Sequence, residues 1–298
     1  MKLPFQLGIM TDEVSQHIED AIRLAHEFGL TALELRSVDG LQLHLLEPQR
    51  LEQIGEQIRK AGLAVCALST PVFKCELDDP EEVKRSKEIL LQDLRIANLL
   101  GAGILRGFSF WAKADVPFAD AFPRIVRELQ SIAPLLEEAK VVFALEFDPA
   151  VYATNGAKVA RIVEAVGSPW IRALYDPGND MWDPDGEVPY PDGYEHLKPY
   201  MCHIHLKDAV RSGEEVEAVA VGTGQVDYRR LFARLEEDRY AGYCIVETHY
   251  RLRSKLTEEQ LKRPSGHLFS EGGEEASRQC LQSLFGLLGE LFHEKPQQ

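Results

Sequence analysis

Short apolar runs alternate with longer amphipathic segments from one end of the chain to the other. Runs rich in β-branched residues are typical of strands, whereas apolar residues that recur with a period near 3.6 are typical of helices. We predict eight strands, near residues 6–10, 32–36, 64–69, 103–108, 142–147, 171–176, 201–207 and 243–248. Strands that alternate with helices in this way form parallel sheets.

Ordinary helix start and stop residues separate the predicted strands. Pro48 lies where a first helical turn begins, and Gly62 follows the last periodic residue of that segment. Asp79 opens a second helix that ends at Gly101, and these residue types suit those positions. The last helix, over 274–293, carries its apolar residues on one stripe. That stripe either closes a ring of helices or forms the interface of a homo-oligomer.

The number of strands and the lack of a phosphate loop favour a closed barrel over an open sheet. An open doubly wound sheet carries a glycine-rich turn after its first strand, and residues 10–13 contain no glycine. Eight strands are the number that closes a (β/α)8 TIM barrel. We therefore predict an α/β fold with a single TIM-barrel domain over 1–298. Two long segments, near 177–199 and 249–273, follow strands and are expected at the catalytic rim.

Composition and charge exclude several function classes. The 298 residues are 45% hydrophobic and 27% charged, which is the profile of a soluble globular protein. Lys and Arg number 33 against 48 Asp and Glu, a net charge of −15, so we expect no nucleic-acid or membrane partner. No leader peptide and no apolar run of membrane-spanning length are visible. Five cysteines without a C-x-x-C pair fit a reducing compartment, and we expect a cytoplasmic protein.

Acidic and imidazole side chains end several predicted strands in the second half of the chain. Catalytic groups of a TIM barrel project from the carboxyl ends of its strands. Glu146 interrupts an apolar run, and because strand side chains alternate, it points into the barrel when its neighbours point out. The same alternation turns Asp176, His205 and Glu247 inward. Four side chains that can ligate a metal are therefore expected at one mouth.

Carboxylates that share one mouth repel each other unless a cation lies between them. Those of Glu146, Asp176 and Glu247, with a neutral imidazole from His205, are a suitable ligand set for one divalent ion. This mixture of donors favours Mn²⁺, Mg²⁺ or Co²⁺, and Zn²⁺ is also compatible. The alternative is a buried ionic core in which the carboxylates pair with arginines.

A series of short motifs follows the predicted strands of the second half. They are Leu145-Glu146-Phe147, Asp176-Pro177-Gly178-Asn179, His203-Ile204-His205-Leu206-Lys207-Asp208 with Arg211, Val221-Gly222-Thr223-Gly224 before Asp227, and Val246-Glu247. In order and spacing the set resembles the metal-binding and catalytic signature of the xylose-isomerase-like TIM barrel superfamily of sugar isomerases and epimerases. The rhythm of strands and helices extends this likeness over nearly the whole chain.

The resemblance implies roles for particular residues. The metal ligands would be Glu146, Asp176, His205 and Glu247, and both glutamates would double as the acid–base pair flanking the substrate. The family often has a histidine three residues after the strand-six aspartate. Asn179 stands there in this chain and can hydrogen-bond but cannot titrate. Arg211 matches the position of a substrate-oriented arginine, with a solvated loop charge as the alternative.

Three further side chains lie late in predicted strands: Glu34, Arg106 and Lys207. This position brings them to the same mouth, where we expect them to contact the substrate. For Glu34 and Arg106, an ion pair within the barrel is the alternative interpretation.

The expected groups support one kind of proton-transfer chemistry. A divalent ion that binds a hydroxyl and the adjacent carbonyl acidifies the C–H between them, because it stabilises the enediolate. Return of the proton to the other face gives epimerisation, and return to the neighbouring carbon gives ketose–aldose isomerisation. We therefore predict a metal-dependent isomerase or epimerase of a sugar, sugar phosphate or polyol. The alternative is a dehydratase of a keto-polyol, of the inosose or dehydroshikimate type that the family includes.

Two other classes fit the sequence less well. A non-catalytic barrel that binds a sugar would need a metal but not carboxylates on two faces of the substrate. The DNA-repair relative endonuclease IV needs additional histidine ligands and a DNA-binding face. Few histidines lie in the first-half strands, and the net charge is −15, so neither requirement is met.

Overall fold

Eight parallel strands close into a barrel in the computed structural model, which describes residues 3–292 apart from the side chain of Leu261. The strands are β1 (Gln6–Met10), β2 (Ala32–Leu35), β5 (Ala64–Ser69), β6 (Ile104–Gly107), β7 (Val142–Glu146), β8 (Ile171–Tyr175), β9 (Met201–Leu206) and β12 (Tyr243–Val246). Their order around the barrel is β1-β12-β9-β8-β7-β6-β5-β2. The predicted TIM barrel is confirmed, and each predicted strand is found within two residues of its expected ends.

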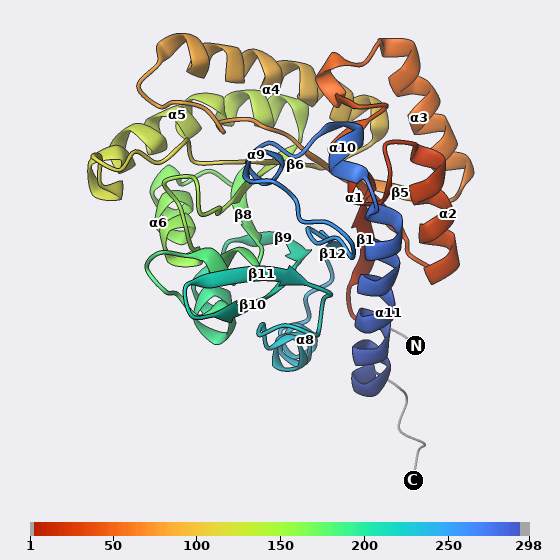
Figure 1. Ribbon diagram of the computed structural model, residues 1–298. Helices are drawn as coiled ribbons and strands as arrows, with labels where there is room; N and C mark the ends of the chain where they lie inside the picture. Colours follow the sequence, from red (N-terminus) through yellow and green to blue (C-terminus); the bar gives the residue numbers. More distant parts are fainter. Residues whose placement is uncertain (1–2, 293–298) are drawn as a thin grey trace.

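Seven longer helices surround the barrel among the described residues (Figure 1). They are α2 (Ile18–Phe28), α3 (Pro48–Lys60), α4 (Pro80–Leu100), α5 (Phe118–Ala139), α6 (Gly156–Val166), α8 (Tyr228–Glu237) and α11 (Gly273–Phe292). Pro48 is the first residue of α3, as predicted. The Asp79 carboxylate accepts hydrogen bonds from the backbone N–H groups of Glu81 and Glu82 and so caps α4.

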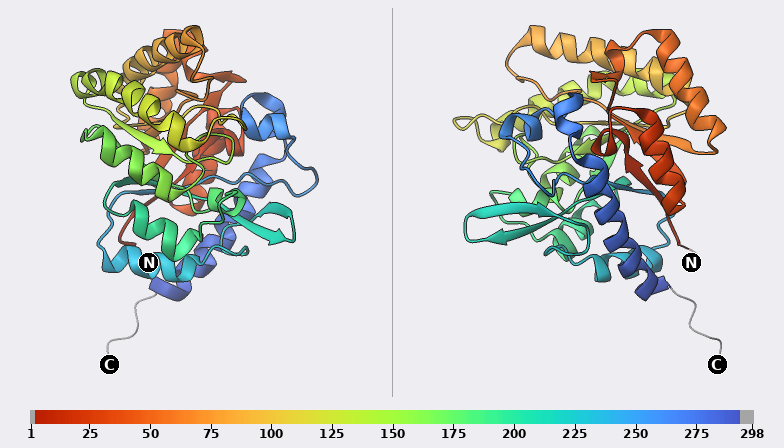
Figure 2. Two further views of the ribbon diagram at one scale, coloured as in Figure 1. Left: turned by 90° about the vertical axis from the view of Figure 1, so that its left-hand side faces the viewer. Right: turned by 45° about the vertical axis from the view of Figure 1, so that its right-hand side comes forward.

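The last helix closes the ring. Leu281, Leu284 and Leu288 on its apolar stripe are buried, and α11 packs against the short helix α1 (Thr11–Val14), against α2 and against α8. In Figure 2 it runs beside the first helices of the chain. The predicted last residue, His293, lies outside the described residues. This contact with the molecule's own barrel accounts for the buried part of the stripe without a second subunit.

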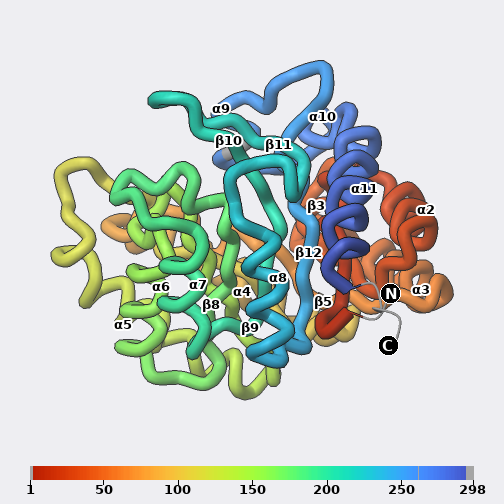
Figure 3. Tube along the Cα trace, turned by 90° about the horizontal axis from the view of Figure 1, so that it is seen from below, coloured from red at the N-terminus to blue at the C-terminus, as the bar shows by residue number. Residues whose placement is uncertain are grey.

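Hairpins and short helices that the hydrophobic pattern did not predict decorate the rim. The hairpins pair β3 (Ser37–Val38) with β4 (Leu41–Gln42) and β10 (Asp208–Ser212) with β11 (Glu215–Val219). The short helical turns are η1 (Leu43–Leu45), η2 (Asn179–Trp182), η3 (Pro189–Gly193), α7 (Tyr194–Leu197), α9 (Glu258–Lys262) and α10 (Gly266–Ser270). Five of these turns lie in the two long segments. Figure 3 shows α9, α10, β10 and β11 at the same end of the barrel.

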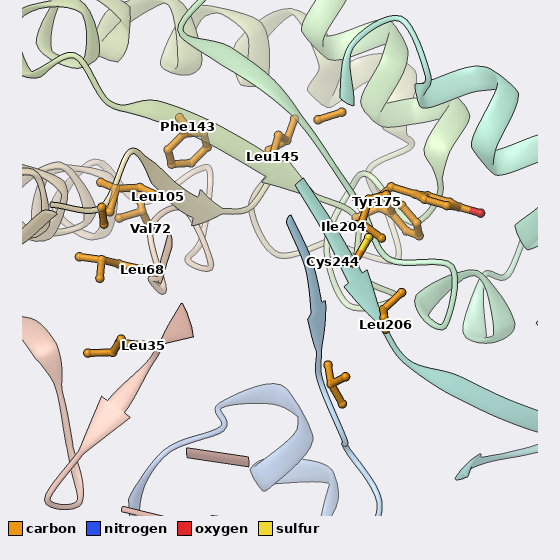
Figure 4. Packing of buried hydrophobic residues seen from close by; sticks show 14 of the residues in the cluster. Leu35, Leu68, Val72, Leu105, Phe143, Leu145, Tyr175, Ile204, Leu206 and Cys244 are labelled. Atoms are coloured by element: carbon orange, nitrogen blue, oxygen red, sulfur yellow. The ribbon is translucent and has the colours of Figure 1, made fainter. Parts of the chain in front are cut away.

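The main hydrophobic core lies between the barrel and its helices. Strand residues that point outward, such as Leu105, Leu145 and Ile204, are fully buried there (Figure 4). Because side chains alternate along a strand, the residues between them point into the barrel. The inward residues near the carboxyl ends of the strands are polar, and they form the site described below. Among residues 3–292, no helix is both long and apolar enough to cross a membrane.

One buried carboxyl group outside the barrel links stability to pH. Asp93 on α4 is 2% exposed, and burial raises the pKa of its carboxyl to about 7. In the unfolded chain this group ionises near its ordinary value of 3.8. Between these values the unfolded chain holds fewer protons, so stability falls as the pH rises from about 4 to about 7.

We therefore expect Asp93→Asn to stabilise the protein at pH 8, by roughly 2 to 4 kcal/mol. At pH 4 the aspartic acid is already neutral in the folded protein, and the gain should vanish. Urea unfolding of both proteins at the two pH values measures the difference. An equal gain at pH 4 and pH 8 would contradict the titration of Asp93 as its cause.

Candidate metal centre

Four predicted ligands converge inside the carboxyl end of the barrel. Glu146 is the last residue of β7 and His205 lies in β9, while Asp176 and Glu247 directly follow β8 and β12. These strands are consecutive neighbours around the barrel. One ligand atom from each of the four side chains lies within 4.8 Å of the other three. The side chains are all buried, so the barrel itself fixes the geometry of the cluster.

The ammonium group of Lys207 lies within this cluster. Its Nζ is 2.7 Å from Asp176 Oδ2 and 2.8 Å from Glu247 Oε2. It also donates to Asn179 Oδ1 at 3.0 Å. Glycine is required at position 178, because a Cβ there would lie 2.6 Å from the carbonyl oxygen of Lys207. The short loop after β8 can therefore approach β9 closely enough for these contacts.

Two arginines neutralise the other sides of the cluster. The Nε of Arg106 lies 3.3 Å from Glu146 Oε2. Arg36 donates from Nη1 to Glu247 Oε1 at 2.9 Å, and its other nitrogens pair with Asp12 and Glu13 at 3.0 Å. Each carboxylate of the cluster except Asp176 thus contacts an arginine, and Asp176 contacts Lys207.

Glu34 lies beneath the cluster instead of lining the cavity. It is fully buried, and its carboxylate is 2.7 Å from His203 Nε2 and 3.2 Å from His205 Nε2. A carboxylate on the far nitrogen of a ligating histidine fixes the orientation of its ring. The structure therefore does not place Glu34 in contact with substrate. It matches the alternative of an ion pair within the barrel, because the strand carries Glu34 below the mouth.

Asn179 and Arg211, whose roles the family resemblance implied, lie in different places: one borders the cavity and the other does not. Asn179 borders the cavity, and its Nδ2 donates to the carbonyl of Phe147 at 2.9 Å. Arg211 is exposed on β10 and contacts the carbonyl of Met181. It does not border the cavity, because the β10–β11 hairpin turns it away. The role of Arg211 in orienting the substrate stays a prediction.

Burial and neighbouring cations set the protonation of the three carboxyl groups. Burial raises the pKa of Asp176 to about 6, although Lys207 opposes the shift. Burial acts in the same direction on Glu146 and Glu247, but the surrounding cations and hydrogen-bond donors together outweigh it, with Arg106 the largest of these for Glu146 and Lys207 for Glu247. Both pKa values therefore lie below the usual 4.5. The two glutamates are therefore carboxylates at neutral pH, ready to ligate a cation or accept a proton.

The cluster opens into a cavity of about 810 Å³. Besides Glu146, Glu247 and Lys207, three aromatic side chains line it: Phe108, Trp111 and Trp182. Aromatic faces pack well against the apolar face of a sugar ring, and a few charged groups then fix its orientation. The volume and lining suit a small polar molecule.

A comparison with protein families shows which family this barrel belongs to. Residues 22–269 match the family model described as xylose isomerase-like TIM barrel. The chain belongs to this family. The resemblance inferred from the ordered motifs is thereby confirmed. No curated protein matches the sequence.

Solved structures of low sequence identity share the xylose isomerase-like fold. The IOLI protein with a bound zinc atom is 17% identical with a TM-score of 0.76, covering 97% of this chain and 99% of its own. The probable 3-DHS dehydratase AsbF of Bacillus anthracis is 15% identical with a TM-score of 0.72, covering 94% and 99%. The D-psicose 3-epimerase of Clostridium cellulolyticum H10, solved with D-tagatose, is 15% identical with a TM-score of 0.72, covering 95% and 99%. At these identities the likeness shows the fold alone.

The charge balance of this xylose isomerase-like barrel fits a divalent cation. A connected network of buried side chains contains six carboxyl groups, on Asp12, Glu13, Glu34, Glu146, Asp176 and Glu247, and four basic groups, on Arg36, Arg106, Lys207 and Arg251. Without a metal, bound protons offset part of the excess negative charge of this network, because the pKa values of Asp176 and His205 are raised. A divalent ion would supply positive charge to the network instead. Glu247 Oε2 faces the ammonium of Lys207 at 2.8 Å, and a divalent ion bound there would take the place of this contact.

Sequence reasoning missed Glu13, Arg36 and His249. Glu13 lies shortly after β1, Arg36 directly follows β2, and His249 lies three residues after the end of β12. His249 Nδ1 is 2.9 Å from Glu13 Oε1 and 3.5 Å from Glu247 Oε1. The rule that found Glu146 and Glu247, charged residues at strand ends, also points to Glu13 and Arg36 when it is applied to the first half of the chain, and His249 lies two residues beyond Glu247.

Proposed function

We propose that the protein is a divalent-metal-dependent isomerase or epimerase of a sugar or polyol. The observation that carries the proposal is the buried cluster of Glu146, Asp176, His205 and Glu247 at the base of a cavity. A purely structural ion network would not need to leave its carboxylates facing a cavity of substrate size. Mn²⁺, Mg²⁺ or Co²⁺ suits the three oxygen donors and one nitrogen, and Zn²⁺ also fits.

The two glutamates are proposed to carry the proton. When bound, a divalent ion would supply polarisation of neighbouring hydroxyl and carbonyl oxygens and so acidify the C–H between them. Glu247 and Glu146 both border the cavity, and their carboxylates are the proposed bases. One carboxylate removes the proton from one face of the carbon, and the other returns a proton to the opposite face or to the next carbon.

Lys207 and Asn179 are proposed to position the substrate. The ammonium of Lys207 and the side-chain amide of Asn179 are hydrogen-bonded to each other and border the cavity. Both can donate to substrate oxygens, and neither loses its hydrogen-bonding capacity near neutral pH. Phe108, Trp111 and Trp182 would cover the apolar face of the ring and exclude water.

A dehydratase is the second candidate, because the same cavity holds a proton donor for a departing hydroxyl group. Lys207 contacts Glu247, so its ammonium stands beside one of the two proposed bases. Proton abstraction followed by loss of a β-hydroxyl would then give water and an unsaturated ketone. The appearance of its ultraviolet absorbance separates this reaction from isomerisation, which creates no new double bond.

Metal analysis of the purified protein tests the proposed centre. We expect about one divalent ion per chain in the wild type after dialysis against trace metal, and its loss in His205→Ala and Asp176→Ala, because each removes a ligand. Elemental analysis gives the stoichiometry. Wild type without metal after this treatment would contradict the proposal and favour an ionic core.

Solvent exchange then separates an enzyme from a sugar-binding barrel. The metal-loaded wild type is incubated with candidate ketoses, inososes and dehydroshikimate in deuterated water. An isomerase or epimerase washes deuterium into the carbon next to the carbonyl, whereas a binder leaves the substrate unlabelled. Binding of a ketose without exchange would overturn the catalytic part of the proposal.

A further inference from the structure

The main cavity continues into a side hollow of about 340 Å³ whose lining is basic. We call this hollow the anion pocket. Its charged lining residues are Arg36, Lys74, Arg106, Lys262 and Arg263. No Asp or Glu lines it among the described residues, although acidic residues outnumber basic ones in the whole chain by 48 to 33. The charged groups that line the hollow are therefore all of opposite sign to the net charge of the protein.

Two of these cations are held against one aromatic ring. Lys74 Nζ lies 4.4 Å and Arg106 Cζ 4.5 Å from the centroid of the Phe108 ring. Lys74 is also 5.3 Å from the Trp111 ring. Cation–π contacts fix both positive groups at the wall of the pocket. Their side chains are mostly buried, so the charges are already in place before a ligand arrives.

Arg106 has hydrogen-bonding capacity that the protein does not use. Its Nε donates to Ser69 Oγ at 3.1 Å, and its Nη1 lies 3.5 Å from the carbonyl of Thr70. Nη2 has no partner among the described residues. Because a guanidinium group offers five N–H donors, the edge that carries Nη2 remains available for an oxyanion.

The acidic partners of the basic residues lie outside the anion pocket. Asp148 pairs with Lys74 at 2.8 Å and borders the main cavity but not the hollow. On α9, Glu258 pairs with Lys262 at 2.5 Å and likewise borders only the main cavity. Both lysines thus line the hollow as well as the main cavity, whereas their counter-charges line only the main cavity. An anionic group is therefore better accommodated in the hollow than in the main cavity.

We propose that the anion pocket binds a carboxylate or phosphate group of the substrate, so that the substrate is an anionic sugar or polyol derivative. This inference rests on the proposed function, since Arg106 joins the pocket to the cluster through Glu146. A divalent ion on Glu146 would take up part of the negative charge that Arg106 now neutralises. Arg106 would then be left with positive charge for the anionic end of the substrate.

Matched ketoses of different charge test the proposal. Calorimetry of the Mn²⁺-loaded protein compares D-fructose with D-fructuronate, which carries a carboxylate, and with D-fructose 6-phosphate. We expect at least one anionic ketose to bind about tenfold tighter than fructose. Whichever anionic ketose binds more tightly shows whether the pocket prefers a carboxylate or a phosphate. Equal or weaker binding of both anionic ketoses would overturn the proposal.

Two substitutions should move this preference in opposite directions. Lys74→Met removes a positive charge but keeps an apolar stem on Phe108, and we expect the preference for the anionic ketose to fall about threefold or more. Asp148→Asn removes the counter-charge of Lys74 and keeps the oxygen that accepts from the Ala150 N–H. The preference should then rise. Lys60→Met, at an exposed pair with Glu56, is the matched control. Equal shifts in all three variants would contradict a local pocket.

Failure of the anion pocket is distinguishable from failure of the proposed function. Deuterium exchange into a neutral ketose with no preference for an anionic one supports the metal centre and overturns the pocket. A preference that responds to Lys74→Met and Asp148→Asn without any exchange supports the pocket and overturns the proposed reaction.

Discussion

Glu247→Gln and Glu146→Gln are each expected to lower turnover of a verified substrate by about a thousandfold or more. Gln keeps the shape of the side chain, and the Arg36 Nη1 that donates to Glu247 can donate to the amide oxygen instead. An amide cannot accept the substrate proton, however, and ligates a divalent ion more weakly than a carboxylate. Steady-state rates with saturating Mn²⁺ measure the loss.

A neutralised carboxylate elsewhere on the cavity provides the control. Glu76 lines the same cavity but is partly exposed and pairs with Lys113 at 3.2 Å. Glu76→Gln makes the same chemical change away from the cluster, and we expect nearly wild-type turnover. Unfolding curves establish that all three variants remain folded. Near wild-type rates in Glu146→Gln or Glu247→Gln would show that the residue is not part of the acid–base pair.

Most of the barrel could be predicted because its signals are local. The apolar run 142–147 is long enough to mark a strand, and alternation within it decides that Leu145 faces the helices and Glu146 the interior. The caps of α4 are equally local, since Asp79 and Gly101 act on the adjacent backbone. The eight-strand count then leaves few ways to bury the sheet.

The structure of the rim was harder to predict because it depends on contacts between residues that are not neighbours in the sequence. The β10–β11 hairpin alternates few apolar residues, so its strands lack the usual hydrophobic signal. Its position is fixed instead by the buried carboxylate of Asp208, which accepts from the backbone N–H groups of Gly222 and Gly224 at 2.9 Å. Such contacts, between residues 14 and 16 positions apart in the sequence, leave no periodic pattern.

In the candidate site, too, the sequence predicts which way a side chain points but not which residues it contacts. Alternation along β9 places His203, His205 and the following Lys207 on the same face, and all three are buried. Depth in the barrel decides their partners, and depth depends on the stagger between strands. That stagger places Glu34 beside both histidines and Lys207 beside Asp176. A strand-end rule alone therefore could not separate a residue that supports the cluster from one that faces the cavity.

Lys207→Met is expected to destabilise the metal-free protein and to strengthen its binding of Mn²⁺. The ammonium of Lys207 is buried between Asp176 and Glu247. Its removal leaves two buried carboxyl groups without that cation, which costs roughly 3 kcal/mol of unfolding free energy. A divalent ion competes with the ammonium for the same oxygens. It should therefore bind the variant more tightly and restore its stability by mass action.

Thermal unfolding with and without Mn²⁺ checks both halves of this expectation, and calorimetry gives the affinity directly. The metal-free variant should melt below the wild type, and Mn²⁺ should raise its Tm by more than it raises that of the wild type. Lys74→Met is a matched control, because Lys74 pairs with Asp148 outside the cluster and its loss should not enhance the response to Mn²⁺. Weaker Mn²⁺ binding by Lys207→Met would mean that the ammonium holds Asp176 in a ligating position, so that the lysine supports the metal centre instead of competing with it.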